Sequence, residues 1–332
     1  MSVTVHQRPG VYSAYDASSL VSGRSAGGVV GLAGVNTKAQ AGMVHLVTRY
    51  EQAVTIFGDD GEEGMAELIR LALKNGASAV AAVAVANESG YQAAFDALAA
   101  VENIAVVICG STSQSVQQAL RDSVAQASAA RMERIAVVAG GVEEGVSALV
   151  ARAKADGCHF IKIMVSGIME FDRFGGLTDT PCSPEMTRDM IAIAHDAGFA
   201  VMAHANGVEA VSRALSAGVD SIEHGAYLDR DTIHQLAETG AVWVPTLAAY
   251  GNLRGLGRFP DEALNPLTAL QQENVAYAAS IGAKIACGSD AGAYAVPHST
   301  GAEDEARLLR EALGDRTDAV LTEGERVIRE KF

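Results

Sequence analysis

Eight short apolar segments alternate with amphipathic segments from Ala79 onward. The apolar segments are 79–86, 104–109, 135–139, 160–165, 199–203, 219–222, 241–247 and 284–288. Strands that are apolar on both faces are typical of parallel sheets covered by helices. The segments with helical spacing are about 65–74, 91–101, 115–132, 142–155, 184–197, 208–217, 230–239 and 270–282. The alternation therefore predicts an α/β fold of parallel β/α units with right-handed crossovers.

The number of strand candidates suggests how these units are arranged. Eight parallel strands close a (β/α)8 barrel. We therefore expect a TIM-barrel-like second half, with strands of the type that occupy barrel positions four to eight, completed by the β/α units that precede it. The alternative is a Rossmann-like N-terminal sheet together with a partial barrel. Two further apolar stretches, 27–35 and 43–48, are strand candidates outside the eight.

Composition argues against several classes of partner and location. The 332 residues carry a formal net charge of −15, which disfavours nucleic acid and anionic membranes as partners. No apolar stretch approaches the roughly 20 residues that span a bilayer, and no signal-peptide pattern opens the sequence. The four cysteines form no Cys-x-x-Cys pair, so neither a zinc ribbon nor a redox motif is predicted. We expect a cytoplasmic protein with reduced thiols, with homo-oligomerisation left open.

Four ionisable side chains lie within or close to the ends of four predicted strands: Lys162 inside 160–165, and His204, His224 and Asp290 shortly after the other three. Such groups are costly in an apolar strand unless they are paired or bound to a metal. The carboxyl ends of parallel strands meet at one face of a barrel, where catalytic residues lie. Because imidazole and carboxylate suit Zn²⁺, we predict one metal site from the four. The alternatives are a lysine extending from a strand end and a hydrogen-bonded core histidine.

Five stretches around these residues carry a family resemblance. They are FIKIMVSG (160–167), VMAHANG (201–207), SIEHGAYLD (221–229), VWVPTLAAY (242–250) and KIACGSDAG (284–292). Together they resemble the amidohydrolase superfamily, in its imidazolonepropionase-like and Xaa-Pro-dipeptidase-like branch, over about residues 156–332. The resemblance implies a metal-dependent hydrolase of amide or peptide-like C–N bonds in a small substrate.

The resemblance also implies a role for each of the four residues. Lys162 corresponds to a lysine that is often carboxylated, which turns a cation into an oxygen ligand. His204 and His224 correspond to imidazole ligands. Asp290 corresponds to a metal-binding carboxylate that also takes a proton from the attacking water. A bound metal lowers the pKa of that water to roughly 7.

One part of the family pattern is missing. The first strand of the family normally supplies His-x-His, and no two of the eight histidines are two residues apart. We therefore expect one divalent metal rather than two, most simply Zn²⁺ on Lys162, His204 and His224, and a hydrolase that is impaired by the loss.

Three more residues are candidate substrate contacts. Tyr227, Tyr250 and Arg173 lie on loops that follow predicted strands. The alternative is that each is a plain loop residue.

The N-terminal part of the chain resembles a different family. The stretches PGVYSAYDASSLVSGRSAGGVVGLAG (9–34), AELIRLALKNGASAVAAVAV (66–85) and LRDSVAQASAARMERIAVVAGG (120–141) are similar to contractile phage tail sheath proteins. That resemblance implies a structural subunit without catalytic residues, which is the alternative function. We predict a tail-sheath-like segment over 1–155 and an amidohydrolase-like metal-binding segment over 156–332, joined as a hybrid of natural, engineered or artefactual origin.

Overall fold

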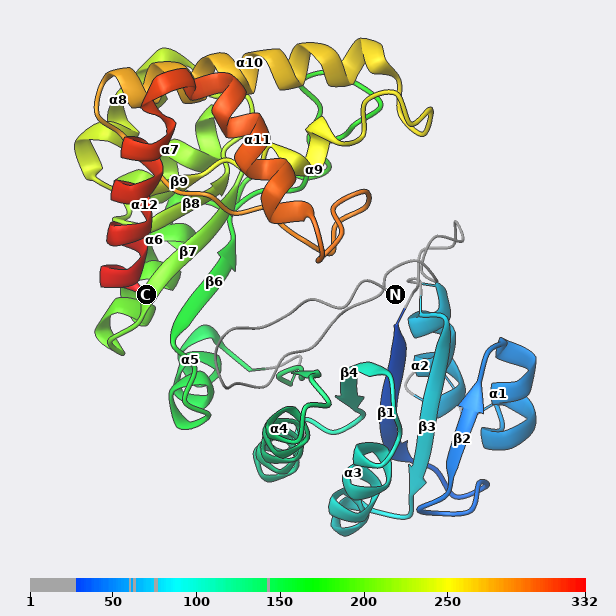
Figure 1. Ribbon diagram of the computed structural model, residues 1–332. Coiled ribbons are helices and arrows are strands. Elements are labelled where there is room, and N and C mark those ends of the chain that lie inside the picture. The colour runs from blue at the N-terminus through cyan, green and yellow to red at the C-terminus, as the bar shows by residue number, and fades with distance from the viewer. Residues whose placement is uncertain (1–27, 60, 62–63, 75–76, 142–143) are drawn as a thin grey trace, which may run out of the picture. The chain divides into compact units, whose positions relative to one another are not determined.

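The computed structural model describes residues 28–59, 61, 64–74, 77–141 and 144–332. The chain divides into two compact units, Met1–Gly141 and Val142–Phe332, and each is described by itself (Figure 1). Part of the sheath-like resemblance, residues 9–27, lies outside the described residues. The predicted boundary between residues 155 and 156 was drawn where one family resemblance ends and the other begins. The division into compact units does not test those resemblances, so the boundary stays a prediction.

The first unit is a five-stranded sheet with helices on both faces. Its strand order is β2-β3-β1-β4-β5, with β2 antiparallel to β3 and the other pairs parallel. Strand β3 is buried along its whole length and β1 over its middle four residues, as their apolar sequences predict. The elements are β1 Val29–Val35, β2 Val44–Val47, α1 Tyr50–Phe57, α2 Met65–Lys74, β3 Ala79–Val85, the 3-10 turn Glu88–Gly90, α3 Tyr91–Ala99, β4 Ile104–Cys109, α4 Gln114–Ala129 and β5 Ile135–Val137.

Two separate apolar clusters show that this sheet is covered on both sides. Side chains of α1 and α2 pack with one set of strand residues, and side chains of α3 and α4 pack with the other set. This is the doubly wound arrangement that the Rossmann-like alternative describes.

The second unit is a parallel five-stranded sheet that carries the predicted site. Its strand order is β10-β9-β8-β7-β6. None of the described helices is long and apolar enough to cross a bilayer. The elements are α5 Val146–Ala155, β6 Phe160–Met164, α6 Pro184–Asp196, β7 Ala200–Ala205, α7 Val208–Ser216, β8 Ser221–His224, α8 Arg230–Thr239, β9 Val242–Val244, α9 Ala248–Gly251, α10 Asp261–Ser280, β10 Lys284–Ile285, α11 Gly301–Leu313, the 3-10 turn Gly314–Arg316 and α12 Thr317–Lys331.

The structure confirms the α/β class and the parallel β/α units. All eight predicted strands are present, but three belong to the first sheet and five to the second. The alternative of a Rossmann-like sheet with a partial barrel therefore describes the strand pairing of the described residues. The helix predicted from residue 270 begins instead at Asp261 and contains Pro266. A proline normally ends a helix, but here buried neighbours such as Leu264 and Leu267 hold the segment helical. The last two helices, α11 and α12, were not predicted.

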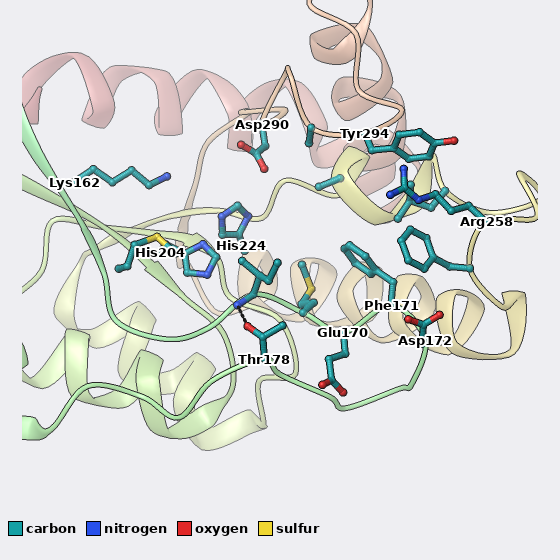
Figure 2. A pocket seen from close by; sticks show the side chains of 17 residues that line it. Lys162, Glu170, Phe171, Asp172, Thr178, His204, His224, Arg258, Asp290 and Tyr294 are labelled. Carbon is teal, nitrogen blue, oxygen red and sulfur yellow. Dashed lines mark hydrogen bonds between the residues drawn. The ribbon is translucent and has the colours of Figure 1, made fainter. Parts of the chain in front are cut away.

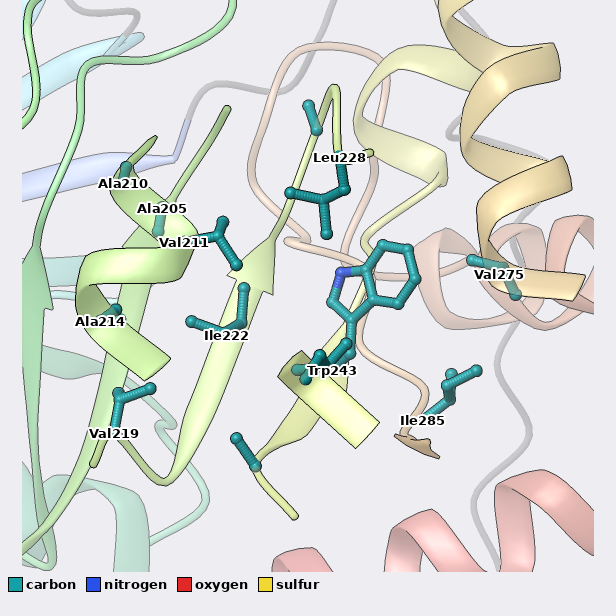
Figure 3. Packing of buried hydrophobic residues seen from close by; sticks show 14 of the residues in the cluster. Ala205, Ala210, Val211, Ala214, Val219, Ile222, Leu228, Trp243, Val275 and Ile285 are labelled. Carbon is teal, nitrogen blue, oxygen red and sulfur yellow. The ribbon is translucent and has the colours of Figure 1, made fainter. Parts of the chain in front are cut away.

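Trp243 on β9 forms the centre of the core beneath the site (Figure 3). Its side chain is fully buried among residues such as Ile222 and Ile285. Its Nε1–H donates a hydrogen bond of 2.9 Å to the backbone oxygen of His224. Gly225 permits this approach, because a Cβ at that position would lie 2.6 Å from Nε1. The indole therefore fixes the backbone at the end of β8.

Gly324 provides a test of how α12 packs on β10. Replacing an interior helical glycine by alanine usually stabilises a helix by about 1 kcal/mol. A Cβ at residue 324 would overlap the backbone oxygen of Ile285, so we expect Gly324→Ala to lower the free energy of unfolding by about 2 kcal/mol. Urea unfolding measures this change.

The matched control is Gly145→Ala, where an added Cβ meets no described atom within 4 Å. Gly145 is the N-cap of α5, where alanine is less favourable than glycine, so we expect that variant to lose at most about 1 kcal/mol. A Gly324→Ala protein as stable as the parent would contradict the packing.

Candidate functional site

A cavity of about 820 Å³ in the second unit brings together the four residues that the sequence predicted. Lys162 comes from β6, His204 from β7, His224 from the end of β8, and Asp290 from the loop after β10. Figure 2 shows their side chains gathered at one end of this cavity. The strands β6, β7 and β8 are paired in parallel register, so residues near their carboxyl ends lie side by side.

The two histidines form a close, buried pair. Their ring centroids are 4.6 Å apart at an interplanar angle of 65°, and the residues are only 6% and 7% exposed. Burial lowers the pKa of His204, and burial with the neighbouring His204 and Lys162 lowers the pKa of His224 to about 3. Both imidazoles are therefore neutral near pH 7, and the neutral form is the one that binds metals.

Each imidazole is held through a different ring nitrogen. His204 Nε2 lies 3.1 Å from the Gly167 carbonyl oxygen, which can only accept, so Nε2–H donates. The Asn206 amide nitrogen lies 3.3 Å from the same Nε2 atom. Because the amide NH₂ group can only donate, it cannot accept the Nε2 proton in place of the Gly167 oxygen. His224 instead uses Nδ1, which lies 2.7 Å from Thr246 Oγ1. The bond to Gly167 leaves Nδ1 of His204 available to a ligand, and Nε2 of His224 is available when Nδ1–H donates to the Thr246 hydroxyl.

Three residues of this region have left-handed backbone conformations. The φ angles are 70° at His224, 49° at Thr246 and 56° at Asp290. Such conformations cost roughly 1–3 kcal/mol each in residues other than glycine, and they cluster at functional sites. The strain therefore supports a functional role for this end of the sheet.

The far side of the cavity is aromatic and carries one arginine. The Arg258 guanidinium lies 4.0 Å from the ring centroid of Tyr294 and 5.3 Å from that of Phe259. Phe171 packs on Phe259 with centroids 5.3 Å apart, and Figure 2 shows Phe171, Arg258 and Tyr294 opposite the histidines. Sequence reasoning missed this wall because its residues lie on loops, which have no periodic pattern.

The three candidate substrate contacts do not line this cavity. Tyr250 is fully buried and donates to the Pro245 carbonyl oxygen at 3.4 Å. Tyr227 is half-buried, and Arg173 is exposed in an ion pair of 3.0 Å with Glu170. Their predicted contact with substrate stays a prediction.

Two buried carboxyl groups near the site were also missed. Glu223 on β8 accepts a hydrogen bond of 2.7 Å from Ser221 Oγ, and burial raises its pKa. Glu305 on α11 is fully buried and accepts the Ala248 N–H at 2.7 Å. Burial raises the pKa of Glu305 to about 7. Glu223 could have been found from the sequence, because it directly follows the predicted strand 219–222 and precedes His224. Glu305 lies on a helix that was not predicted.

The cavity provides two of the ligands that a metal ion requires, the imidazoles of His204 and His224. Two neutral imidazoles with free nitrogens on opposite ring positions are suitable ligands for Zn²⁺. Within the described ranges, no three His, Cys, Asp or Glu side chains are grouped closely enough to hold a metal by themselves. The further groups at the same cavity end are the Lys162 amine and the Asp290 carboxylate.

Comparison with known sequences identifies the family. The amidohydrolase family profile matches residues 33–320. The chain belongs to the amidohydrolase family. This is a family of hydrolases that generally use divalent metals.

Individual relatives add less about activity. Uncharacterised proteins of Mycobacterium tuberculosis (strain H37Rv) and Mycobacterium bovis are each 33% identical over 184 residues, which cover 52% of this chain and 49% of theirs. The chain thus spans about half the length of the curated relatives it matches. The crystal structure of a Xaa-Pro dipeptidase with bound methionine is similar with a TM-score of 0.50 and 21% identity, over 92% of this chain and 75% of the other. That likeness concerns the fold alone.

The lowered pKa of His224 predicts a pH dependence of stability. Because the unfolded chain takes up a proton near pH 6.5 and the folded chain only near pH 3, stability is present above pH 6.5 and is lost as the pH falls toward 3. Between pH 7 and pH 5 this group should remove about 2 kcal/mol from the free energy of unfolding of metal-free protein.

Urea unfolding of the parent and of His224→Gln at both pH values isolates this contribution. The parent should lose more stability than the variant over the interval. His234→Gln, an exposed histidine on α8, is the control and should follow the parent. Parallel behaviour of the parent and His224→Gln would contradict the prediction.

Proposed function

We propose that this chain is a metal-dependent hydrolase of amide or peptide-like C–N bonds in small substrates. The observation that carries the proposal is the buried pair of neutral imidazoles, His204 and His224, which line one cavity together with Lys162. Membership of the amidohydrolase family supports hydrolysis as the reaction.

Lys162, His204 and His224 would hold a single ion, with Zn²⁺ as the metal. Lys162 would serve as an oxygen ligand after its amine is carboxylated by carbon dioxide. Its exposure on β6 gives carbon dioxide access to the amine. When bound, the metal would supply Lewis acidity, which polarises a carbonyl group and lowers the pKa of water.

Asp290 is the proposed general base and a further candidate ligand. Its carboxylate is exposed at the cavity and would take the proton from the attacking water. Asp290 has a left-handed backbone conformation and lies in the loop that follows β10.

A peptide-like substrate suits the shape and lining of the cavity. The volume of about 820 Å³ lies in the range of small-molecule sites. Phe171, Phe259 and Tyr294 offer apolar contact, and Arg258 offers charge to a carboxylate. The Xaa-Pro dipeptidase of similar fold makes dipeptides the first substrates to examine.

Several expectations remain proposals beside this one. They are the cytoplasmic location, a homo-oligomer, the absence of nucleic-acid and membrane partners, impairment through the missing His-x-His, and the tail-sheath-like origin of residues 1–155. Electron microscopy of the purified protein would separate tubes from compact particles and so tests the structural alternative.

Metal binding tests the proposed ligands directly. We expect metal-free parent protein to bind one equivalent of Zn²⁺ by calorimetry. Substituting His204→Ala or His224→Ala should weaken binding by more than the 10–100-fold typical of losing a supporting group. His234→Ala, on the exposed face of α8, should bind as the parent does. Equal affinity in all four proteins would remove the site from consideration.

Replacing the proposed base separates catalysis from binding. In assays with Xaa-Pro dipeptides and N-acyl amino acids, Asp290→Asn should lower kcat by about 10²–10⁴-fold. Asp189→Asn on the exposed surface of α6 is the matched control and should leave kcat unchanged. An Asp290→Asn protein with the kcat of the parent would refute the assignment of the base.

A further inference from the structure

We propose that Glu305 is a positioning residue for His224, acting through the turn between β9 and α9. The proposal rests on the metal-dependent function proposed above and extends it to a residue outside the cavity. Glu305 lies on α11 and does not line the cavity. Its influence would therefore pass through intermediate groups rather than through contact with the substrate.

The first step is the contact between Glu305 and the turn. Glu305 is fully buried, and its Oε2 accepts the Ala248 N–H at 2.7 Å. The Leu247 N–H also interacts with this carboxyl group. Both amides belong to the start of α9, where no intrahelical acceptor is available to them. The carboxyl group thus fixes two successive peptide units.

The second step is the residue just before those peptide units. Thr246 has a φ of 49°, which is unfavourable for a β-branched residue. A strained residue persists only where its surroundings hold it. The hydrogen bonds to Glu305 immediately after Thr246, and the bond from Ala249 N–H to the Thr246 oxygen at 3.0 Å, supply that constraint.

The third step reaches the imidazole. Thr246 Oγ1 lies 2.7 Å from His224 Nδ1, and both residues are buried. When Nδ1–H donates to this hydroxyl oxygen, Nε2 is the nitrogen left for a ligand. Trp243 and Gln271 bond to the backbone oxygen of His224, so they hold the chain but do not select the tautomer of the ring.

A purely structural role for Glu305 would leave the ring unaffected. Packing alone does not explain why a glutamate is buried here, because its Oε1 is buried without a hydrogen-bond partner among the described residues. A buried carboxyl oxygen without a partner destabilises a fold, and an apolar side chain of the same size would avoid that cost. Retaining the carboxyl group is explained if the turn needs its two amide contacts.

The test compares Glu305→Gln, Glu305→Met and Thr246→Val in the full chain. Methionine keeps the size and removes both acceptor oxygens, whereas glutamine keeps one. Glu303→Gln, exposed on the same helix, is the matched control. The readout is the ¹⁵N chemical shifts of the histidine rings in metal-free protein, with His224 assigned by the signals lost in His224→Gln. Zn²⁺ affinity is measured in parallel.

In the parent and in Glu303→Gln we expect His224 in the Nδ1–H tautomer. Thr246→Val and Glu305→Met should shift it to a mixture of tautomers and weaken Zn²⁺ binding by about 10–100-fold. Glu305→Gln should show a smaller shift in the same direction. Unchanged His224 signals in either folded Glu305 variant overturn the proposal, even if that variant is less stable. If Glu305→Met does not fold, Glu305→Gln decides.

These outcomes are distinct from failure of the proposed function. A parent protein that binds no Zn²⁺ refutes the metal site, while the tautomer signals still report whether Glu305 controls the ring of His224.

Discussion

Parallel pairing of β6, β7 and β8 is the constraint on which the candidate site depends. In a parallel sheet the carboxyl ends of neighbouring strands meet at one edge. Lys162, His204 and His224 therefore reach the same cavity, although 42 residues separate the first two and 20 separate the last two in the sequence. The apolar side chains of these strands pack beneath, with Trp243 at the centre. The same parallel pairing of strands therefore brings the site residues together and aligns the apolar side chains of the core.

Several independent features of the site reduce the stability of the folded protein. Two imidazoles are buried 4.6 Å apart, and His224, Thr246 and Asp290 have left-handed backbones. Hydrogen bonds with Gly167 and Thr246 hold the two imidazole rings, and the bond from Trp243 holds the backbone of His224, so they offset part of this cost. Features that cost stability and are held by specific contacts are typical of sites that bind or react. This is the physical basis for interpreting the cavity as functional.

The family resemblance covers more of the chain than the site does. The amidohydrolase profile extends over residues 33–320, which includes strands of both sheets. The residues with site chemistry nevertheless all come from the second unit. The His-x-His of the family has no counterpart among the eight histidines, which is why a single ion is proposed rather than two.

The sequence by itself determined the strands, most of the helices and the four ionisable residues at strand ends. It could do so because apolar runs, helical spacing and a histidine after a strand are local patterns. Only the tertiary structure decided how the eight strands divide between two sheets, because pairing depends on contacts between distant segments. For the same reason the sequence did not predict the positions of Glu305 and of the aromatic side chains around Arg258. These positions depend on how helices pack and on the paths of loops. The burial of Tyr250 in the core was likewise decided by packing, since the sequence shows only that it follows a strand.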